Sequence, residues 1–330
     1  MAWERFRCNI DCDDDPQNCV SEKLFMQMAD RIAEDGFQKA GYKYVCIDDC
    51  WASYNRTLEG DLQPDPTRFP SGIKKLADYI HSKGLKFGLY ADYGHLTCER
   101  YPGSIDYIQQ DMQLFADWGV DYLKMDGCFA DPLTFDEGYP TVTRALNETG
   151  RHIVFSCSWP AYQVWGGMTD SWLSMVRIVE WYGDHQHEMI PVAGPGQWND
   201  PDQPLMMSND LRDIAPWARE ILLNMEVIDV NQDKLGKMGR RVTQSPRRFT
   251  EVWCRPLHDG SVAVVLSSRR ADQPIHIEAF FHEVGLPTIM AKARDLFEHK
   301  DLGTFKKSFR AKVNPSGVVM VKLSPIHYEL

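Results

Sequence analysis

Lys124 and Asp126 are the pair of residues whose types and spacing point most directly to catalysis. They stand two positions apart in the run 121–126, which is typical of a β-strand, so both side chains are expected on the same face of that strand. An ammonium group beside a carboxylate keeps the carboxylate ionised, as a nucleophile must be. A buried ion pair that only stabilises the strand has the same pattern, so both interpretations remain open at this point.

Asp48 and Asp49 follow a second apolar run and precede Cys50 and Trp51. Carboxylates accept hydrogen bonds from neighbouring sugar hydroxyls, and an aromatic face packs on the apolar side of a sugar ring. The pair therefore suits sugar recognition. A solvated loop or a Mg²⁺ site would use the same residues, although no third metal ligand follows at a clear spacing.

Two further polar clusters are better explained as solvent-exposed groups than as metal-binding or catalytic sites. The run 13–15 is acidic and lies between Cys12 and Cys19, a spacing that matches no standard zinc pattern, so a solvated turn is expected. His185 and His187 could bind a metal, but their position at the end of a predicted helix favours an exposed pair. The sequence therefore implies neither a metal nor a cofactor.

These candidate residues lie in a stretch that alternates between helical and extended patterns. Helices are expected at 21–40, 73–83, 105–118 and near 141–149, and strands at 44–49, 86–92, 121–126 and 152–157. This order predicts an α/β fold with a parallel sheet. Acidic residues end several of the strands and no GxGxxG motif follows any of them, which favours a (β/α)₈ barrel over a Rossmann fold.

The pattern changes after residue 237 to short β-rich runs at 250–256, 261–267 and 318–323, with an Asn-Pro-Ser-Gly turn before the last. We expect two domains, a catalytic barrel at 1–237 and an antiparallel β domain at 238–330. The β domain carries no cluster of catalytic residue types, which indicates a structural or interfacial role.

Composition restricts the function classes. The net charge of −11 argues against nucleic acid as a partner, and no stretch has the roughly 20 apolar residues of a membrane span. The start, Met1 to Glu4, lacks the basic and apolar regions of a signal peptide, so no leader is expected within these residues. Even so, most of the nine cysteines lie before residue 100, and sequons occur at Asn55 and Asn147, as in a secretory-pathway protein. A reduced cytosolic protein with chance sequons is the alternative.

Several motifs, in this order, resemble the signatures of the lysosomal α-galactosidase and α-N-acetylgalactosaminidase family. They are WERFRC at 3–8, IDDCW at 47–51, YAD at 90–92, KMDGC at 124–128, SCSWP at 156–160, WNDPD at 198–202 and NQD at 231–233. The resemblance implies a (β/α)₈ TIM barrel followed by an antiparallel β-sandwich. It also implies a glycosylated, lysosomal homodimer that hydrolyses glycosides with retention of configuration and needs no cofactor.

The same resemblance implies roles for individual residues. Asp126 is expected to be the nucleophile, and Ser158 and Ala161 stand where α-galactosidases have Glu and Leu. These smaller residues leave room for a 2-acetamido group, so α-linked N-acetylgalactosamine is favoured over galactose. The expected sugar-binding residues are Trp3, Asp48, Asp49, Tyr90, Lys124, Cys128, Ser158 and Ala161. The expected disulfides are Cys8–Cys50, Cys12–Cys19 and Cys98–Cys128, which leaves Cys46, Cys157 and Cys254 without an assignment.

The chain also departs from the family pattern. Between Gly167 and Asp170 it lacks a segment that contains the family's catalytic acid/base, and a second gap follows Asp202. The start is expected to be shortened and the barrel incomplete. Asp170 and Asp200 are the remaining candidates for the acid/base. An inactive isoform or a galactoside-binding protein is therefore the alternative to an active hydrolase, and a metal-dependent barrel enzyme is a third possibility.

Overall fold

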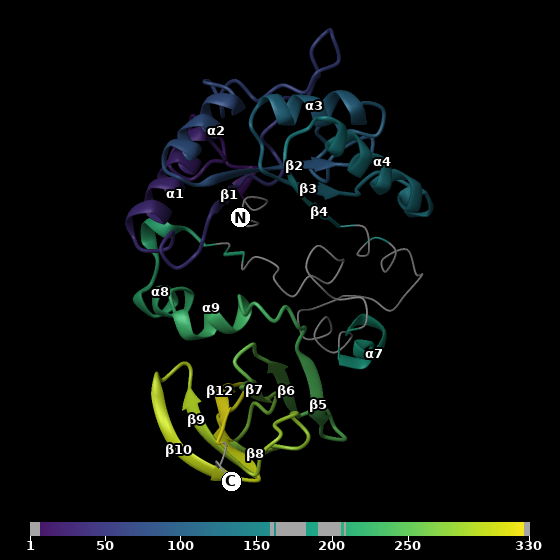
Figure 1. The fold of residues 1–330 in the computed structure, drawn as a ribbon. Coiled ribbons are helices and arrows are strands. Elements are labelled where there is room, and N and C mark those ends of the chain that lie inside the picture. The colour runs from purple at the N-terminus through teal and green to yellow at the C-terminus, as the bar shows by residue number, and fades with distance from the viewer. Residues whose placement is uncertain (1–6, 159–161, 163–182, 191–205, 208, 327–330) are drawn as a thin grey trace. The chain divides into compact units, whose positions relative to one another are not determined.

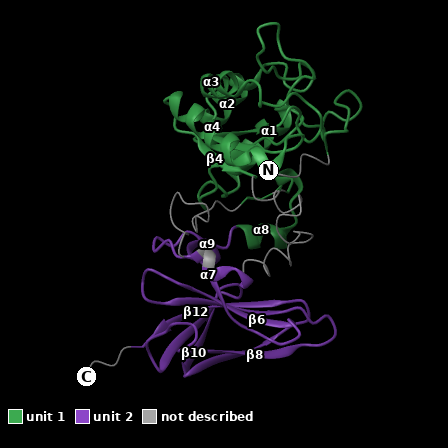
Figure 2. Cartoon of the chain, turned by 90° about the vertical axis from the view of Figure 1, so that its right-hand side faces the viewer, with its two compact units in different colours: residues 1–172, 205–222 green, residues 173–204, 223–330 purple. Residues whose placement is uncertain are grey.

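The computed structural model describes residues 7–158, 162, 183–190, 206–207 and 209–326 (Figure 1). The chain divides into two compact units (Figure 2). Residues 1–172 and 205–222 form the first unit, and residues 173–204 and 223–330 form the second. The structural division thus assigns residues 223–237 to the second unit, whereas the sequence-based boundary assigned them to the first.

The first unit contains a parallel sheet whose strands follow one another in chain order, β1-β2-β3-β4. The strands are β1 (Tyr44–Cys46), β2 (Lys86–Asp92), β3 (Tyr122–Asp126) and β4 (Val154–Cys157). The register pairs Tyr90 with Lys124 and Asp92 with Asp126, so the polar ends of β2 and β3 lie side by side. The parallel α/β architecture expected from the sequence is confirmed. Among the described strands, the sheet does not close on itself.

Helices separate these strands along the chain. They are α1 (Glu22–Glu34), α2 (Ile73–Ser82), α3 (Ile108–Asp117) and α4 (Phe135–Glu148), with the short turn η2 (Pro132–Thr134) before α4. Ser21 caps the N-terminus of α1, because its hydroxyl accepts a hydrogen bond from the Leu24 backbone nitrogen, and the helix buries Met28 and Ile32 on one face. Helix α4 begins earlier than the expected helix near 141–149. The first unit ends with η4 (Leu211–Asp213) and α8 (Pro216–Leu222).

The burial of β2 and β3 reflects their central position in this sheet. From Phe87 to Asp92, every residue of β2 is buried, as in parallel strands that are covered on both faces. Along β3, Leu123 and Met125 are fully buried, whereas Lys124 and Asp126 are only partly covered. One face of β3 therefore belongs to the core, and the other presents polar groups.

The second unit is an antiparallel β domain, as expected. Its six-stranded sheet has the order β10-β9-β12-β7-β6-β5, and β11 pairs with β8. The strands are β5 (Arg240–Gln244), β6 (Thr250–Pro256), β7 (Val262–Ser268), β8 (Ile275–Phe280), β9 (Met290–Asp295), β10 (Lys300–Lys306), β11 (Ser308–Val313) and β12 (Val318–Pro325). The helices α7 (Gln186–Met189) and α9 (Met225–Asn231) also belong to this unit.

The core of the second unit consists of side chains from both sheets. Val264, Leu266, Phe309 and Val321 are essentially inaccessible to solvent and belong to one hydrophobic cluster. Burial of this apolar area is the main driving force for packing a sandwich. No described helix in either unit has the length and apolar character needed to cross a bilayer.

Candidate active site

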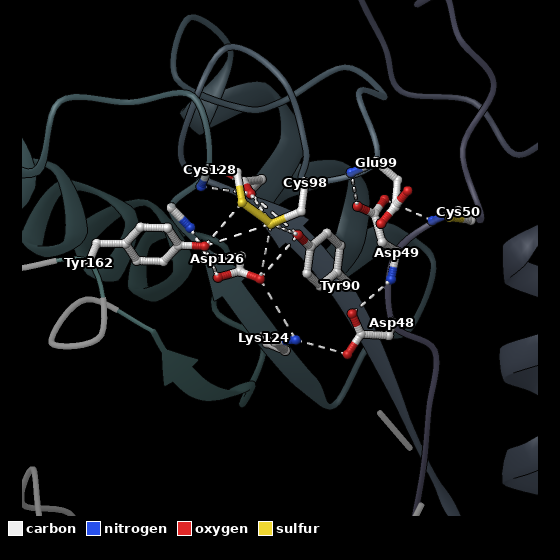
Figure 3. Close-up of polar contacts among 12 residues, drawn as sticks. Asp48, Asp49, Cys50, Tyr90, Cys98, Glu99, Lys124, Asp126, Cys128 and Tyr162 are labelled. Atoms are coloured by element: carbon white, nitrogen blue, oxygen red, sulfur yellow. Dashed lines mark hydrogen bonds and ion pairs between the residues drawn. A yellow bond between two sulfur atoms is a disulfide. The ribbon is translucent and has the colours of Figure 1, made fainter. Parts of the chain in front are cut away.

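Lys124 and Asp126 project from the same face of β3, as their spacing predicted. Lys124 Nζ lies 3.8 Å from Asp126 Oδ2 and donates a hydrogen bond of 2.8 Å to Asp48 Oδ2 (Figure 3). Burial alone would lower the pKa of Lys124, but the charges of Asp48 and Asp126 outweigh it, so the pKa is raised. A permanently charged ammonium therefore lies between two carboxylates.

Tyr90 places its hydroxyl beside the same carboxylate. Tyr90 Oη lies 3.2 Å from Asp126 Oδ2, and the Lys124 ammonium lies 5.0 Å from the centroid of the tyrosine ring. Burial and the nearby carboxylates, Asp126 first among them, raise the pKa of Tyr90, so the phenol stays protonated. The predicted site residue Tyr90 is thus a hydrogen-bond donor at the end of β3.

A second tyrosine, Tyr162, contacts the other oxygen of Asp126. Its hydroxyl donates to Asp126 Oδ1 at 2.6 Å and lies 3.1 Å from the sulfur of Cys128 (Figure 3). The Cys98–Cys128 disulfide borders Asp126, with Cys98 Sγ 3.5 Å from Asp126 Oδ2. A disulfide sulfur carries no hydrogen, so this is a packing contact. Each oxygen of Asp126 therefore has a phenolic donor, and Oδ2 also packs against the disulfide.

Asp49 is more deeply buried than Asp48 and binds backbone groups. It is 4% exposed, and its carboxylate accepts hydrogen bonds from the backbone nitrogens of Cys50 and Glu99 at 2.7 and 2.9 Å. Burial raises the pKa of Asp49 although these donors oppose the shift. Asp49 thus ties the loop after β1 to the loop that contains Cys98, and its role in sugar binding stays a prediction.

Three loops of this site contain residues with a left-handed backbone, a conformation that is costly for non-glycine residues. Cys50, Arg100 and Phe129 have φ angles of 71°, 69° and 52°. Each is either a disulfide cysteine or lies within two residues of one. The Arg100 guanidinium also lies 5.1 Å from the centre of the Phe129 ring. The strained backbone is therefore held in place by covalent crosslinks and by packing.

Ser158 extends the β3–β4 ladder beyond the last residue of β4. Its backbone nitrogen donates to Met125 O at 3.0 Å, which fixes the position of the residue next to β3.

The other predicted site residues lie outside the described residues. They are Trp3 and Ala161 for sugar binding and Asp170 and Asp200 as acid/base candidates. The structure thus brings together Asp48, Tyr90, Lys124, Asp126 and Cys128, with Asp49 directly behind them.

Sequence reasoning missed the roles of two residues at this site. Tyr162 follows the SCSWP motif, and its contact with Asp126 could be anticipated only from a three-dimensional template. Asp92 was recognised as the end of a strand, but no role was assigned to it. It is fully buried, and it accepts hydrogen bonds from the backbone nitrogens of Gly94 and Cys128 at 2.8 and 3.1 Å.

All three expected disulfides are present, Cys8–Cys50, Cys12–Cys19 and Cys98–Cys128. In the described part of the chain, one group of residues has the types and spacing of metal ligands, Asp92 with Cys98 and Cys128. Metal binding by cysteine requires a thiolate, and both of these sulfurs are in a disulfide. The group therefore does not fit a metal ion.

Comparison with family models matches almost the whole chain. The model described as alpha galactosidase A matches residues 1–167, 163–203 and 203–233, and that of the alpha galactosidase A C-terminal beta sandwich domain matches 236–317. The first match is interrupted near residue 167 and at 203, where the sequence predicted two missing segments. The two models meet between residues 233 and 236.

Individual proteins match over similar lengths. The α-N-acetylgalactosaminidase of Gallus gallus is 46% identical over 376 residues, covering 98% of this chain and 92% of the relative. The human α-N-acetylgalactosaminidase is 44% identical, covering 99% and 91%, and human α-galactosidase A is 41% identical, covering 98% and 87%. These alignments are longer than the chain, so the relatives contain residues that have no counterpart here.

Solved structures agree with these matches. The crystal structure of α-galactosidase I from Mortierella vinacea superposes with a TM-score of 0.81 at 26% identity, covering 98% of this chain and 95% of that one. The fold is accordingly that of a TIM barrel followed by an antiparallel β-sandwich, of which the described part of the barrel supplies β1 to β4. The agreement of family models, relatives and fold establishes that the chain belongs to the α-galactosidase A family.

Proposed function

We propose that this protein is a retaining glycoside hydrolase that removes terminal α-linked N-acetylgalactosamine, and more slowly α-linked galactose, from glycolipids and glycoproteins. The observation that carries the proposal is the environment of Asp126. Its carboxylate has Lys124 at 3.8 Å, the Tyr162 hydroxyl at 2.6 Å and the Tyr90 hydroxyl at 3.2 Å. These neighbours place a positive charge and two hydrogen-bond donors against the carboxylate and hold it in one orientation, which is what a nucleophile requires.

In this mechanism Asp126 attacks the anomeric carbon and forms a covalent glycosyl-enzyme intermediate. Asp48 and Lys124 lie on one side of the nucleophile and offer an acceptor and donors for sugar hydroxyls. The disulfide Cys98–Cys128 forms a rigid wall on the other side. The sugar ring is thereby bound between charged hydrogen-bonding groups and an apolar surface.

Selection of the acetamido sugar is assigned to Ser158 and Ala161. Ser158 follows β4 directly, where a small side chain leaves space for the acetamido group and its hydroxyl can bond to that group. The names of the relatives from Gallus gallus and Homo sapiens support this preference, because both are α-N-acetylgalactosaminidases with 44% identity or more.

Hydrolysis also needs a second carboxyl group that protonates the leaving oxygen and then activates water. Asp92 is close to Asp126 but fully buried, so it cannot reach a leaving group. We assign this role to Asp170 or Asp200, the candidates that remain from the sequence.

We further propose a lysosomal protein that reaches its compartment through the secretory pathway and acts as a homodimer. Three disulfides fit an oxidising route of synthesis. Both sequon asparagines, Asn55 and Asn147, are exposed and accessible to a glycan.

The test is a pre-steady-state assay on 4-nitrophenyl α-N-acetylgalactosaminide and the matching α-galactoside, with Asp126→Asn as the isosteric control. Nitrophenolate leaves with little help from an acid, so the assay reports on Asp126 separately from the second carboxyl group. We expect steady release that favours the acetamido sugar and is lost in the variant. A burst of about one equivalent of nitrophenolate, followed by almost no further release, would mean that the nucleophile acts without an acid/base. Absence of release from both sugars would refute the hydrolase.

A further inference from the structure

The hydroxyl of Tyr90 lies between two carboxyl groups. Tyr90 Oη is 3.2 Å from Asp126 Oδ2 and 3.3 Å from Asp92 Oδ2, and the β2–β3 register places the two aspartates opposite each other. A phenol has one proton and can donate to only one acceptor at a time. If both aspartates were ionised, one of the two carboxylates would face a lone pair of the Tyr90 oxygen without a hydrogen between them. The geometry therefore requires one more proton in the cluster.

The surroundings of Asp92 and Asp126 decide which of the two carboxyls takes that proton. Asp126 is partly accessible and has the Lys124 ammonium at 3.8 Å. Asp92 is 0% exposed, and within the described residues it has no ion-pair partner. An isolated charge in such an environment is far more costly than a neutral acid. The proton therefore belongs on Asp92.

We propose that Asp92 is a positioning residue for the reaction: as a neutral carboxylic acid it donates to Tyr90 Oη, and the Tyr90 proton is thereby directed to the nucleophile Asp126. The inference rests on the proposed function, because it takes Asp126 as the nucleophile. In this arrangement Asp92 Oδ2 donates to Tyr90 while it accepts from the Cys128 backbone nitrogen at 3.1 Å. Its Oδ1 accepts from the Gly94 backbone nitrogen at 2.8 Å. All polar atoms of the buried carboxyl are then satisfied.

The requirement for an atom that both donates and accepts distinguishes aspartic acid from asparagine at this position. An amide nitrogen at the place of Oδ2 could donate to Tyr90, but it would also face the N–H of Cys128. Asp92→Asn is therefore not a neutral substitute, although it cannot titrate. Its expected effect is a loss of activity at every pH.

The electrostatics of the cluster are consistent with a neutral Asp92. Burial raises the pKa of Asp92 to about 8, with a further contribution from the charge of Asp126, against hydrogen bonds that favour the ionised form. Other ionisable groups in the cluster are Tyr90, Tyr139 and Tyr162, all with raised pKa values, together with Asp48, Asp49 and Lys124. The tyrosines remain neutral, so they do not account for a titration near pH 8.

The direct test is difference infrared spectroscopy of the full chain between about pH 6 and pH 9.5, which spans the expected titration. A neutral carboxyl group has a C=O stretch that is well separated from the carboxylate bands, and ¹³C-aspartate labelling identifies it. We expect a labelled band that disappears with a midpoint near pH 8 and is absent from Asp92→Asn. Asp121→Asn is the matched control, because Asp121 is paired with Arg151 at 2.8 Å and its removal should leave the band unchanged.

Asp126→Asn provides an independent measurement if Asp92→Asn does not fold. Removing the negative charge of Asp126 should shift the midpoint of the band to lower pH. An unchanged midpoint, or a band that persists in Asp92→Asn, would overturn the assignment. Because Asp126→Asn needs no turnover for this measurement, the infrared result stands whether or not the protein hydrolyses glycosides.

A kinetic measurement tests whether the proton on Asp92 affects the reaction. The rate of the first nitrophenolate release from 4-nitrophenyl α-N-acetylgalactosaminide, followed against pH, should fall as Asp92 ionises near pH 8. Tyr90→Phe removes the bridging hydroxyl, so its rate should be lower and should no longer depend on this ionisation. An active enzyme whose Asp92 is ionised at acidic pH would refute this inference and leave the proposed function intact. An inactive enzyme with a neutral Asp92 would refute the proposed function, and with it the positioning role, while the protonation of Asp92 would stand.

Discussion

The hydroxyl of Tyr162 donates a hydrogen bond to Oδ1 of Asp126 across 2.6 Å. Tyr162→Phe removes this donor and keeps the ring, which packs against Phe135 with a centroid distance of 5.7 Å. A hydrogen bond to a charged group contributes about 1.5–3 kcal/mol. We therefore expect kcat/KM to fall about tenfold to one hundredfold, with little change in the melting temperature. Tyr79→Phe, whose hydroxyl binds Asp30 at 2.8 Å, is the control and should keep full activity.

Ser158→Glu should change the substrate preference. The backbone of Ser158 is fixed by its hydrogen bond to Met125, so a larger side chain occupies the space assigned to the acetamido group. Relative to the α-galactoside, kcat/KM for the α-N-acetylgalactosaminide should fall by about tenfold or more. Ser158→Ala keeps the space and should have a smaller effect. An unchanged ratio in Ser158→Glu would mean that other residues select the sugar.

Asp92 should make the protein less stable as pH rises. Its pKa of about 8 in the folded state lies above the value of about 3.9 in an unfolded chain. Between these values the folded state holds a proton that the unfolded chain releases, so the free energy of unfolding falls by up to about 1.4 kcal/mol per pH unit. Below pH 3.9 the contribution is constant. Urea unfolding from about pH 5 to pH 8 should show this slope.

In Asp92→Asn the free energy of unfolding should fall less steeply with pH than in the native protein. Asp49 and Asp111, whose pKa values are also raised by burial, contribute with the same sign, so some slope should remain. If the free energy of unfolding had the same pH dependence in the native protein and in Asp92→Asn between pH 5 and pH 8, the assignment of a neutral Asp92 would be wrong.

The ion pair of Arg56 and Asp111 should be important for stability. Asp111 is 0% exposed and accepts two hydrogen bonds of 2.7 Å from the guanidinium, which also lies 4.0 Å from the centre of the Tyr107 ring. Asp111→Asn leaves a buried cation without its counter-charge, at a cost of about 3–5 kcal/mol. Chemical denaturation should show this loss.

The control for that measurement is Asp78→Asn, which removes the exposed pair of Lys74 and Asp78. Both side chains are 59% exposed, and such pairs contribute less than about 1 kcal/mol. Equal losses in the two variants would show that burial does not determine the strength of the Arg56–Asp111 pair.

Those features of the fold that depend on local periodicity could be predicted from the sequence. Strand β2 has the expected bounds, and the two-residue spacing of Lys124 and Asp126 correctly placed both on one face. Helix α4 begins at Phe135, earlier than the helix expected near 141–149. In the structure Gly138 packs against the Tyr93 ring where a Cβ has no room, and Pro140 is accommodated within the helix.

Other features depend on contacts between distant residues and leave little trace in the sequence. Strand β10 is exposed along most of its length and has no alternating apolar pattern, so it was not expected. Tyr162 reaches Asp126 across 36 positions of sequence. The proton shared by Asp92 and Tyr90 depends on strand register and on complete burial of the carboxyl, neither of which composition reveals.

All three disulfides join cysteines that precede residue 129. Because a chain is synthesised from its N-terminus, these crosslinks can close while the strands of the sandwich are still on the ribosome. Cys254, a buried thiol of that sandwich, emerges only afterwards. In the proposed secretory route, this order of synthesis would separate closure of the crosslinks around Asp126 from the appearance of that late thiol, so oxidation of the site would not have to wait for the second unit.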